Sequence, residues 1–207
     1  MTIDAAKFDY AASVTNVMAS MCGYVDELLS NYKQRHASRK SLGAPTIAFL
    51  GHGRCGKDTA AVYFEQISGL KYGGSTSSVV LPLISCALRQ DSDFAWKDRH
   101  NNREFWFRWC NELRRQDSTM LAKMNLSRGD ICVGLRSDIE LVNCLDGGVI
   151  DLPVWISNSR VEKDPTVEFS EADCCLTIDN SGSKWQFYHR LRVLHRMLTS
   201  YFHEERE

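Results

Sequence analysis

The sequence predicts an α/β protein with a three-layer fold, in which a mostly parallel sheet lies between helices and an extra helix precedes it. The first observation is Thr46–Leu50, a short continuous apolar run typical of a parallel strand covered on both faces. A glycine-rich segment and then a helical segment, Ala60–Ile67, follow this strand directly. The second observation is that further short apolar segments alternate with helical or mixed segments, which is typical of parallel α/β sheets.

The N-terminal part is predicted to be helical. Apolar residues recur at helical spacing from Asp4 to about Gln34, which predicts one long amphipathic helix. A basic stretch, Lys33–Lys40, follows, and Ser41–Pro45 has the Gly, Pro and Ser content of a linker. We therefore expect an N-terminal helix with a basic linker over residues 1–44 and one α/β domain over residues 45–207. Two interpretations are open for the basic side chains of this stretch: they are solvated, or some of them contact the phosphates of a partner. The side chains that would make such contacts are Lys33, Arg35, Arg39 and Lys40.

The remaining elements follow from the same patterns. The further candidate strands are Leu70–Tyr72, Ile131–Val133, Val149–Ile156 and Cys175–Ile178. The chain closes with a helical segment from Ser183 to about His203, whose apolar residues share one side. The sequence contains no internal repeat and no low-complexity segment.

Composition narrows the classes of function. The 207 residues include 25 Lys and Arg against 26 Asp and Glu, a formal charge of -1, so overall charge does not draw the protein to nucleic acid. The 8 cysteines show no CxxC and no repeated Cys/His spacing, which favours reduced thiols in an intracellular protein. No apolar run approaches the about 20 residues that a membrane span needs, so no membrane partner is expected.

The glycine-rich segment has the spacing of a nucleotide-binding phosphate loop (P-loop). Gly51-x-x-x-x-Gly56-Lys57 matches GxxxxGK, in which glycines let backbone N–H groups face phosphate oxygens and the lysine adds a positive charge. The helix that follows presents its positive end to the same phosphates. The predicted fold is therefore of the P-loop NTPase type. The residues expected to bind ATP are Gly51, His52, Gly53, Arg54, Cys55, Gly56, Lys57, Asp58 and Thr59.

The residue after the P-loop lysine departs from the standard motif. Asp58 stands where the motif has a Ser or Thr hydroxyl on Mg²⁺, and Thr59 comes one position later. A carboxylate is a hard oxygen ligand that suits Mg²⁺ directly or through water. We therefore predict Asp58 and Thr59 as the metal site. The competing interpretation is a plain turn in which Asp58 caps the helix.

Residues that follow the strands are the next candidates, because ligands of open parallel sheets bind beyond the carboxyl ends of the strands. Ser75 and Thr76 lie in a small, hydroxyl-rich segment after the second candidate strand, and we expect them to bind the acceptor. Arg136 follows the third candidate strand, and its planar guanidinium suits a catalytic role on the transferred phosphoryl group. The alternative for Arg136 is a surface ion pair with Asp138 or Glu140.

A dense charged and aromatic stretch runs from Asp93 to Trp109. Arginines interleaved with Trp and Phe suit a site that holds phosphates and stacks a base. We expect Arg99, His100 and Arg103 to bind the substrate, whereas the competing interpretation makes the aromatic residues core and the arginines solvated. The arginines predicted to converge on phosphates near Lys57 are Arg99, Arg103, Arg108, Arg114, Arg115 and Arg136.

Four short elements give the chain a family resemblance: Gly56–Thr59 (GKDT), Gly134–Glu140 (GLRxxxE), Val154–Ile156 (VWI) and Ile178–Gly182 (IDNxG). On these elements the segment from about Thr46 to Leu198 resembles phage P-loop kinases. That group includes deoxynucleoside monophosphate kinases and 5-hydroxymethyluracil DNA kinases. The resemblance implies an enzyme that uses ATP and Mg²⁺ in the cytoplasm of a phage-infected bacterium.

Two acceptors fit this resemblance. The preferred expectation is transfer of the γ-phosphate of ATP to the hydroxymethyl group of 5-hydroxymethyl-deoxyuridine in phage DNA, a step in thymidine hypermodification. This hydroxyl must lose a proton, and Asp98, next to Arg99 and His100, is the candidate catalytic base. The alternative is a deoxynucleoside monophosphate kinase acting on free dNMPs, whose acceptor oxygen is already anionic. A third reading is an NTP-binding switch module without an acceptor.

Overall fold

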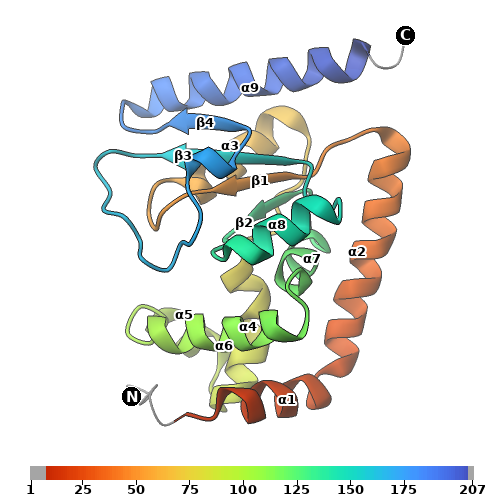
Figure 1. The fold of residues 1–207 in the computed structure, drawn as a ribbon, viewed down its shortest axis with the longest axis vertical. Coiled ribbons are helices and arrows are strands. Elements are labelled where there is room, and N and C mark those ends of the chain that lie inside the picture. The colour runs from red at the N-terminus through yellow and green to blue at the C-terminus, as the bar shows by residue number, and fades with distance from the viewer. Residues whose placement is uncertain (1–7, 205–207) are drawn as a thin grey trace.

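A computed structural model, which describes residues 8–204, contains a four-stranded sheet in which every pairing is parallel (Figure 1). The strands are β1 (Ile47–Leu50), β2 (Ile131–Val133), β3 (Leu152–Ser157) and β4 (Leu176–Asp179), in the spatial order β2-β1-β3-β4. All four residues of β1 are buried, and Ile47 pairs with Ile131 on one side and Leu152 on the other. The continuous apolar sequence of β1 thus reflects a central strand covered on both faces, and the α/β class is confirmed.

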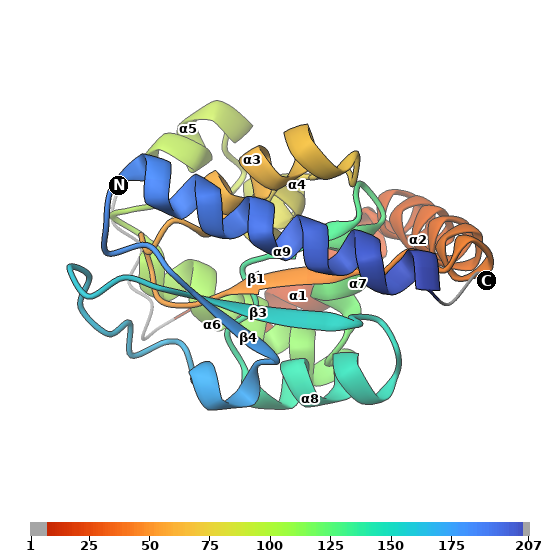
Figure 2. The ribbon, with the colours of Figure 1, turned by 90° about the horizontal axis from the view of Figure 1, so that it is seen from above.

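Helices cover both faces of the sheet (Figure 2). One face carries α3 (Lys57–Ser68) and α9 (Lys184–Glu204), and the other carries α7 (Met120–Leu126) and α8 (Asp138–Asp146). Phe49 of β1 packs in one apolar cluster with Phe64 of α3 and Phe187 of α9. Its neighbour Leu50 belongs to the opposite cluster with Leu141 of α8. The alternating sides of one strand therefore join two helical layers into a three-layer core.

A second helical group lies beyond the edge strand β2 (Figure 1). It consists of α1 (Tyr10–Ser20), α2 (Cys22–Leu42), α4 (Thr76–Leu88), α5 (Ser92–Asp98) and α6 (Arg103–Gln116), and a short 3-10 turn, Glu171–Asp173, lies elsewhere, before β4. Val14 of α1, Val79 of α4 and Trp109 of α6 are all fully buried in its core. Among residues 8–204, no helix combines the length and apolar character needed to cross a membrane.

The N-terminal prediction needs two corrections. The single expected helix is two helices, because the chain leaves helical geometry at Met21 with φ of -116° and ψ of 21°. The basic segment expected to be a linker is the last part of α2, which ends at Gly43 with φ of 61°. Lys, Arg, Gln and Ala are all good helix formers, so the basic stretch extends the helix. The expected start of the first helix, residues 4–7, lies outside the described residues.

One candidate strand is much shorter than predicted. Of Leu70–Tyr72, only Tyr72 pairs with the sheet, through an isolated parallel bridge to Ile131. Gly73 and Gly74 follow it at once, and glycine disfavours extension of a strand. The pairing nevertheless brings the segment after Tyr72 to the β2 edge of the sheet.

The path of the chain marks one end of the sheet as a place for ligands. β1 leads into α3 on one face, whereas β2 leads into α8 on the opposite face (Figure 2). In open parallel sheets, ligands bind beyond the carboxyl ends of two neighbouring strands whose connections leave in opposite directions. The loops after β1 and β2 are therefore the expected position of a site.

Candidate functional site

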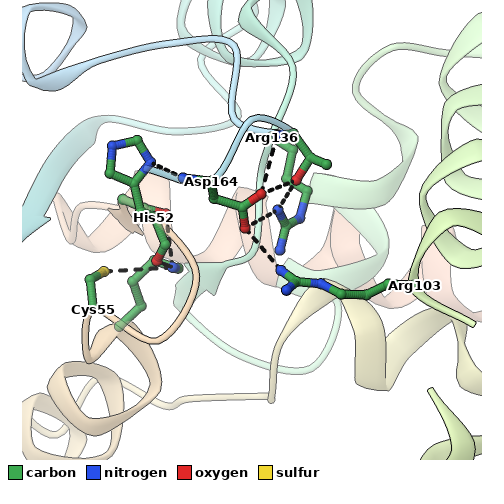
Figure 3. Close-up of polar contacts among 8 residues, drawn as sticks. His52, Cys55, Arg103, Arg136 and Asp164 are labelled. Atoms are coloured by element: carbon green, nitrogen blue, oxygen red, sulfur yellow. Dashed lines mark hydrogen bonds and ion pairs between the residues drawn. The ribbon is translucent and has the colours of Figure 1, made fainter. Parts of the chain in front are cut away.

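The glycine-rich loop connects β1 to α3 and forms one wall of the site (Figure 3). Gly51 has φ of 134°, and a Cβ atom there would lie 2.5 Å from the carbonyl oxygen of Ile156, so only glycine fits. Gly56 has φ of 105° and directly precedes α3, which begins at Lys57. The strand, loop and helix context that a P-loop requires is therefore present, and we refer to Gly51–Lys57, which has the GxxxxGK spacing, as the P-loop.

Lys57 points back over this loop. Its Nζ donates to the carbonyl oxygen of Gly51 at 2.8 Å, to that of His52, and to Cys55 Sγ at 3.7 Å. Burial lowers the pKa of Lys57, and the positive charge of Arg136 acts in the same direction. Lys57 thus lies inside the loop and within electrostatic range of Arg136.

A residue near the C-terminus also supports the loop. Asn180, in the turn between β4 and α9, donates from Nδ2 to the carbonyl oxygen of Cys55 at 2.8 Å. The Cys55 side chain is 1% exposed, and burial raises the pKa of its thiol. The IDNxG element therefore contacts the P-loop through its asparagine.

Both candidate metal ligands are exposed residues at the start of α3. Asp58 lies in the first turn of α3, and its Oδ1 accepts a 2.6 Å hydrogen bond from the hydroxyl of Tyr72. Thr59 is exposed on the same helix. Among the described residues, no group of three or more His, Cys, Asp or Glu side chains could hold a metal ion. Mg²⁺ usually keeps several waters and binds one or two carboxylates together with substrate phosphates, so a single carboxylate beside Lys57 fits this ion.

Two arginines and an aspartate meet opposite the P-loop (Figure 3). Arg103, at the start of α6, and Arg136, in the loop after β2, each donate to Asp164 Oδ2 at 2.9 Å. The carboxylate lies close to the loop, because a Cβ atom on Gly53 would be 2.8 Å from Asp164 Oδ2 and 3.2 Å from an Arg103 nitrogen. Segments after three different strands or helices therefore place charged groups at the P-loop.

Arg99 extends this group of positive charges. Its guanidinium carbon lies 4.3 Å from the ring centroid of Trp96 and 5.9 Å from that of Trp106. Burial lowers the pKa of Arg99, the charge of Asp58 opposes this shift, and the charges of Arg103 and Arg136 reinforce it. Arg99 is therefore within electrostatic range of Asp58 as well as of both arginines. We refer to Arg99, Arg103 and Arg136 as the arginine cluster.

Half of the arginines predicted to converge near Lys57 have other partners. Arg108 and Arg115 pair with glutamates on α6 itself, at positions 104 and 112. Arg114 is 8% exposed and donates to Glu140, whose side chain is fully buried, at 2.8 Å. Arg108 and Arg115 are seven positions apart and so project from one side of α6, whereas Arg114 projects from another side, toward Glu140 of α8.

Arg136 does not form the surface ion pair with Asp138 or Glu140 that was the competing interpretation; it pairs with Asp164 instead. Glu140 pairs with Arg114 and accepts only the backbone N–H of Arg136, at 3.5 Å. Burial raises the pKa of Glu140, although Arg114 and the backbone hydrogen bonds oppose this shift. The guanidinium of Arg136 is therefore left for Asp164 and the P-loop side.

Four predicted site residues have local roles. The hydroxyl of Thr76, a buried residue, donates to the carbonyl oxygen of Val133 at 3.0 Å. Ser75 precedes α4, and its carbonyl oxygen accepts from Ser78. His100 Nδ1 is in hydrogen-bond contact with the carbonyl oxygen of Lys97. The carboxylate of Asp98 accepts hydrogen bonds from the side chains of Asn101 and Asn102. The contacts identified for the described residues do not link any of these four to Lys57 or Asp164.

Asp164 and Thr166 are the residues that sequence reasoning missed. They lie in the long loop between β3 and β4, seven and nine residues after β3 ends, and this loop carries no glycine-rich signal. The local signal is Asp164-Pro165-Thr166, because an aspartate two residues before a threonine commonly forms a side-chain turn. That signal predicts the turn but not its position over the P-loop.

Comparisons with known proteins do not assign the chain to a class. A scan against protein-family models matches no family, and searches of curated proteins and of solved structures return no match. The features of the chain that bear on its function are therefore the P-loop, the arginine cluster and Asp164.

Proposed function

We propose that this protein is an ATP-dependent phosphotransferase of the P-loop kinase type. The observation that carries the proposal is the position of Lys57 in a glycine-rich loop between a central strand and a helix, with Arg103 and Arg136 opposite it. Phosphoryl transfer depends mainly on positioning and on neutralising charge, and a lysine with two arginines supplies that charge.

In this proposal, the P-loop and the start of α3 bind the phosphates of ATP. Lys57 exchanges its hydrogen bonds to loop carbonyls for the phosphate oxygens, and the positive end of α3 adds to the attraction. Asp58 holds Mg²⁺, directly or through water, and bound Mg²⁺ neutralises charge on the phosphates. Arg103 and Arg136 stabilise the charge on the transferred phosphoryl group.

The first candidate acceptor is the hydroxymethyl group of 5-hydroxymethyl-deoxyuridine in phage DNA. Trp96 and Phe94 are 39% and 50% exposed on α5, and Arg99 stacks on Trp96, so this surface suits an unstacked base. If Asp98 is the base, it acts from a position where two asparagine side chains already hold it. The host cytoplasm during infection is the location that goes with this acceptor.

The second candidate acceptor is a free deoxynucleoside monophosphate. The arginine cluster favours it, because a monophosphate brings two further negative charges and needs no base to deprotonate it. Both candidates use the same ATP site. They differ in what occupies the side of Trp96 and Arg99.

One experiment separates these possibilities. The protein is incubated with γ-labelled ATP and Mg²⁺ and offered duplex DNA carrying 5-hydroxymethyluracil, matched unmodified duplex DNA, free dNMPs or no acceptor. We expect label to enter the modified DNA and not the unmodified duplex. Label in dNMPs alone would support the second acceptor, and hydrolysis without transfer would support an NTP-binding switch module. The absence of both transfer and hydrolysis would contradict the proposal.

Asp58→Ala is expected to raise the Mg²⁺ concentration required for half-maximal activity by about 10-fold, because the variant loses a carboxylate that lies within electrostatic range of Lys57. The measurement is a Mg²⁺ titration of phosphoryl transfer at saturating ATP. Tyr72→Phe is the matched control, since it removes the hydrogen bond to Asp58 but keeps the carboxylate. An unchanged titration for Asp58→Ala would assign the metal to Thr59 or another group.

A further inference from the structure

The carboxylate of Asp164 is a largely buried charged group beside the P-loop. Its side chain is 8% exposed, whereas those of its partners Arg103 and Arg136 are 59% and 30% exposed. Burial alone would raise the pKa of Asp164, but hydrogen bonds from Thr166 and Arg136 and the charge of Arg136 hold that pKa well below its ordinary value. The carboxylate therefore stays ionised throughout the physiological range.

Asp164 is oriented by its own loop. Oδ1 accepts hydrogen bonds from the Thr166 hydroxyl at 2.6 Å and from the Thr166 backbone N–H at 3.1 Å. These bonds leave Oδ2 for the two arginines. The hydrogen bonds from Thr166 thus orient the carboxylate from within its own loop, and the carboxylate can in turn fix the arginines.

The loop that carries Asp164 is hydrogen-bonded both to the P-loop and to the loop after β2. The Asp164 backbone N–H donates to His52 Nδ1 in the P-loop at 3.3 Å, and burial lowers the pKa of His52, which keeps that nitrogen available as an acceptor. The Glu168 backbone N–H donates to the carbonyl oxygen of Arg136 at 2.8 Å. The side chains of Thr166 and Arg136 are also in hydrogen-bond contact.

We propose that Asp164 is a positioning residue, which holds Arg103 and Arg136 at the P-loop so that their remaining N–H groups face the transferred phosphoryl group. This inference rests on the proposed phosphotransferase function. Each guanidinium has five N–H groups, so contact with one carboxylate oxygen leaves donors for phosphate. Two arginines and one aspartate carry a net positive charge, so the group still attracts phosphate.

The alternative for Asp164 is a blocking group that occupies a phosphate position and leaves when ATP binds. Such a group needs a loop that is free to move away. This loop instead contacts the P-loop through His52, and it contacts the β2–α8 loop through three hydrogen bonds to Arg136, one to its backbone carbonyl and two from its side chain. The number and spread of these contacts favour a fixed position.

The experiment compares Asp164→Asn with Glu162→Gln, which removes the same charge from an exposed side chain of the same loop. We expect Asp164→Asn to lower kcat by about 100-fold, since misplaced arginines no longer match the transition state, while KM for ATP changes little. Glu162→Gln should leave both constants unchanged. Thr166→Val, which removes one of the bonds that orient Asp164, should lower kcat in the same way but less.

The controls keep the two proposals separate. Wild-type protein without transfer activity would contradict the proposed function itself. If the wild-type protein is active and the Asp164→Asn variant has a normal kcat, only the proposed role of Asp164 is overturned. A lower KM for ATP in that variant would identify a blocking group. If Asp164→Asn fails to fold, as shown by thermal melting, a normal kcat in folded Thr166→Val would overturn the inference.

Discussion

Lys57→Ala is expected to lower the rate of phosphoryl transfer by about 100-fold to 1,000-fold, the typical cost of removing one preorganised donor from a developing negative charge. Lys57 is the only lysine of the P-loop motif, and its Nζ lies against the carbonyl oxygens of Gly51 and His52. No neighbouring lysine can replace it from the same helix turn. The measurement is the initial rate with γ-labelled ATP and whichever acceptor takes up label in the experiment proposed above.

Two further variants separate loss of charge from loss of structure. Lys57→Met keeps most of the side-chain volume and loses only the charge, so its rate should fall as far as that of the alanine variant. Lys71→Ala removes an exposed lysine outside the glycine-rich loop and should keep the wild-type rate. Thermal melting should show that all three variants fold. Full activity in folded Lys57→Ala would contradict the P-loop assignment.

The central part of the fold is predictable because its signals are local. A continuous apolar run identified β1, the glycine spacing identified the turn after it, and α3 begins within that motif, at Lys57. Each of these features depends on residues within one short segment, where backbone preference and burial agree. The same reasoning located the final helix, α9, to within one residue at each end.

The arrangement of charges opposite the P-loop is not local. Arg103 and Arg136 are separated by a helix pair and a strand, and the residue that joins them, Asp164, lies in a loop without regular structure. A sequence pattern can identify arginines but cannot determine which of them meet. Arg114 shows the difference, since its neighbours in space include a buried glutamate 26 positions away.

The basic end of α2 gives a second example. Arg35 and Arg39 were candidates for contact with a partner's phosphates, but both pair with Asp130, which directly precedes β2, at 2.7 and 3.4 Å. Arg39 also donates a hydrogen bond, 2.9 Å long, to the hydroxyl of Thr46, which directly precedes β1. Positive charge in a sequence predicts an anion nearby without showing whether the anion is a ligand or an aspartate of the same chain.

Asp130→Ala is expected to lower the free energy of unfolding by about 3–5 kcal/mol, the usual cost of removing one partner from a buried ion pair. The Arg39 side chain is 8% exposed, so without Asp130 its charge stays buried and unpaired. The backbone N–H of Lys71 also loses its acceptor, Asp130 Oδ2, at 2.8 Å. Urea unfolding of the purified variant measures the change.

Two variants test whether the unpaired charge is the cause. Glu104→Ala breaks the exposed pair with Arg108 on α6 and should cost at most about 0.5 kcal/mol. Adding Arg39→Met to Asp130→Ala should restore part of the lost stability, because no buried charge then remains without a partner. A double variant no more stable than Asp130→Ala would mean that the cost comes from the Lys71 backbone and from packing. In the expected case, Asp130 joins α2 to the sheet, and the basic helix end stabilises the domain.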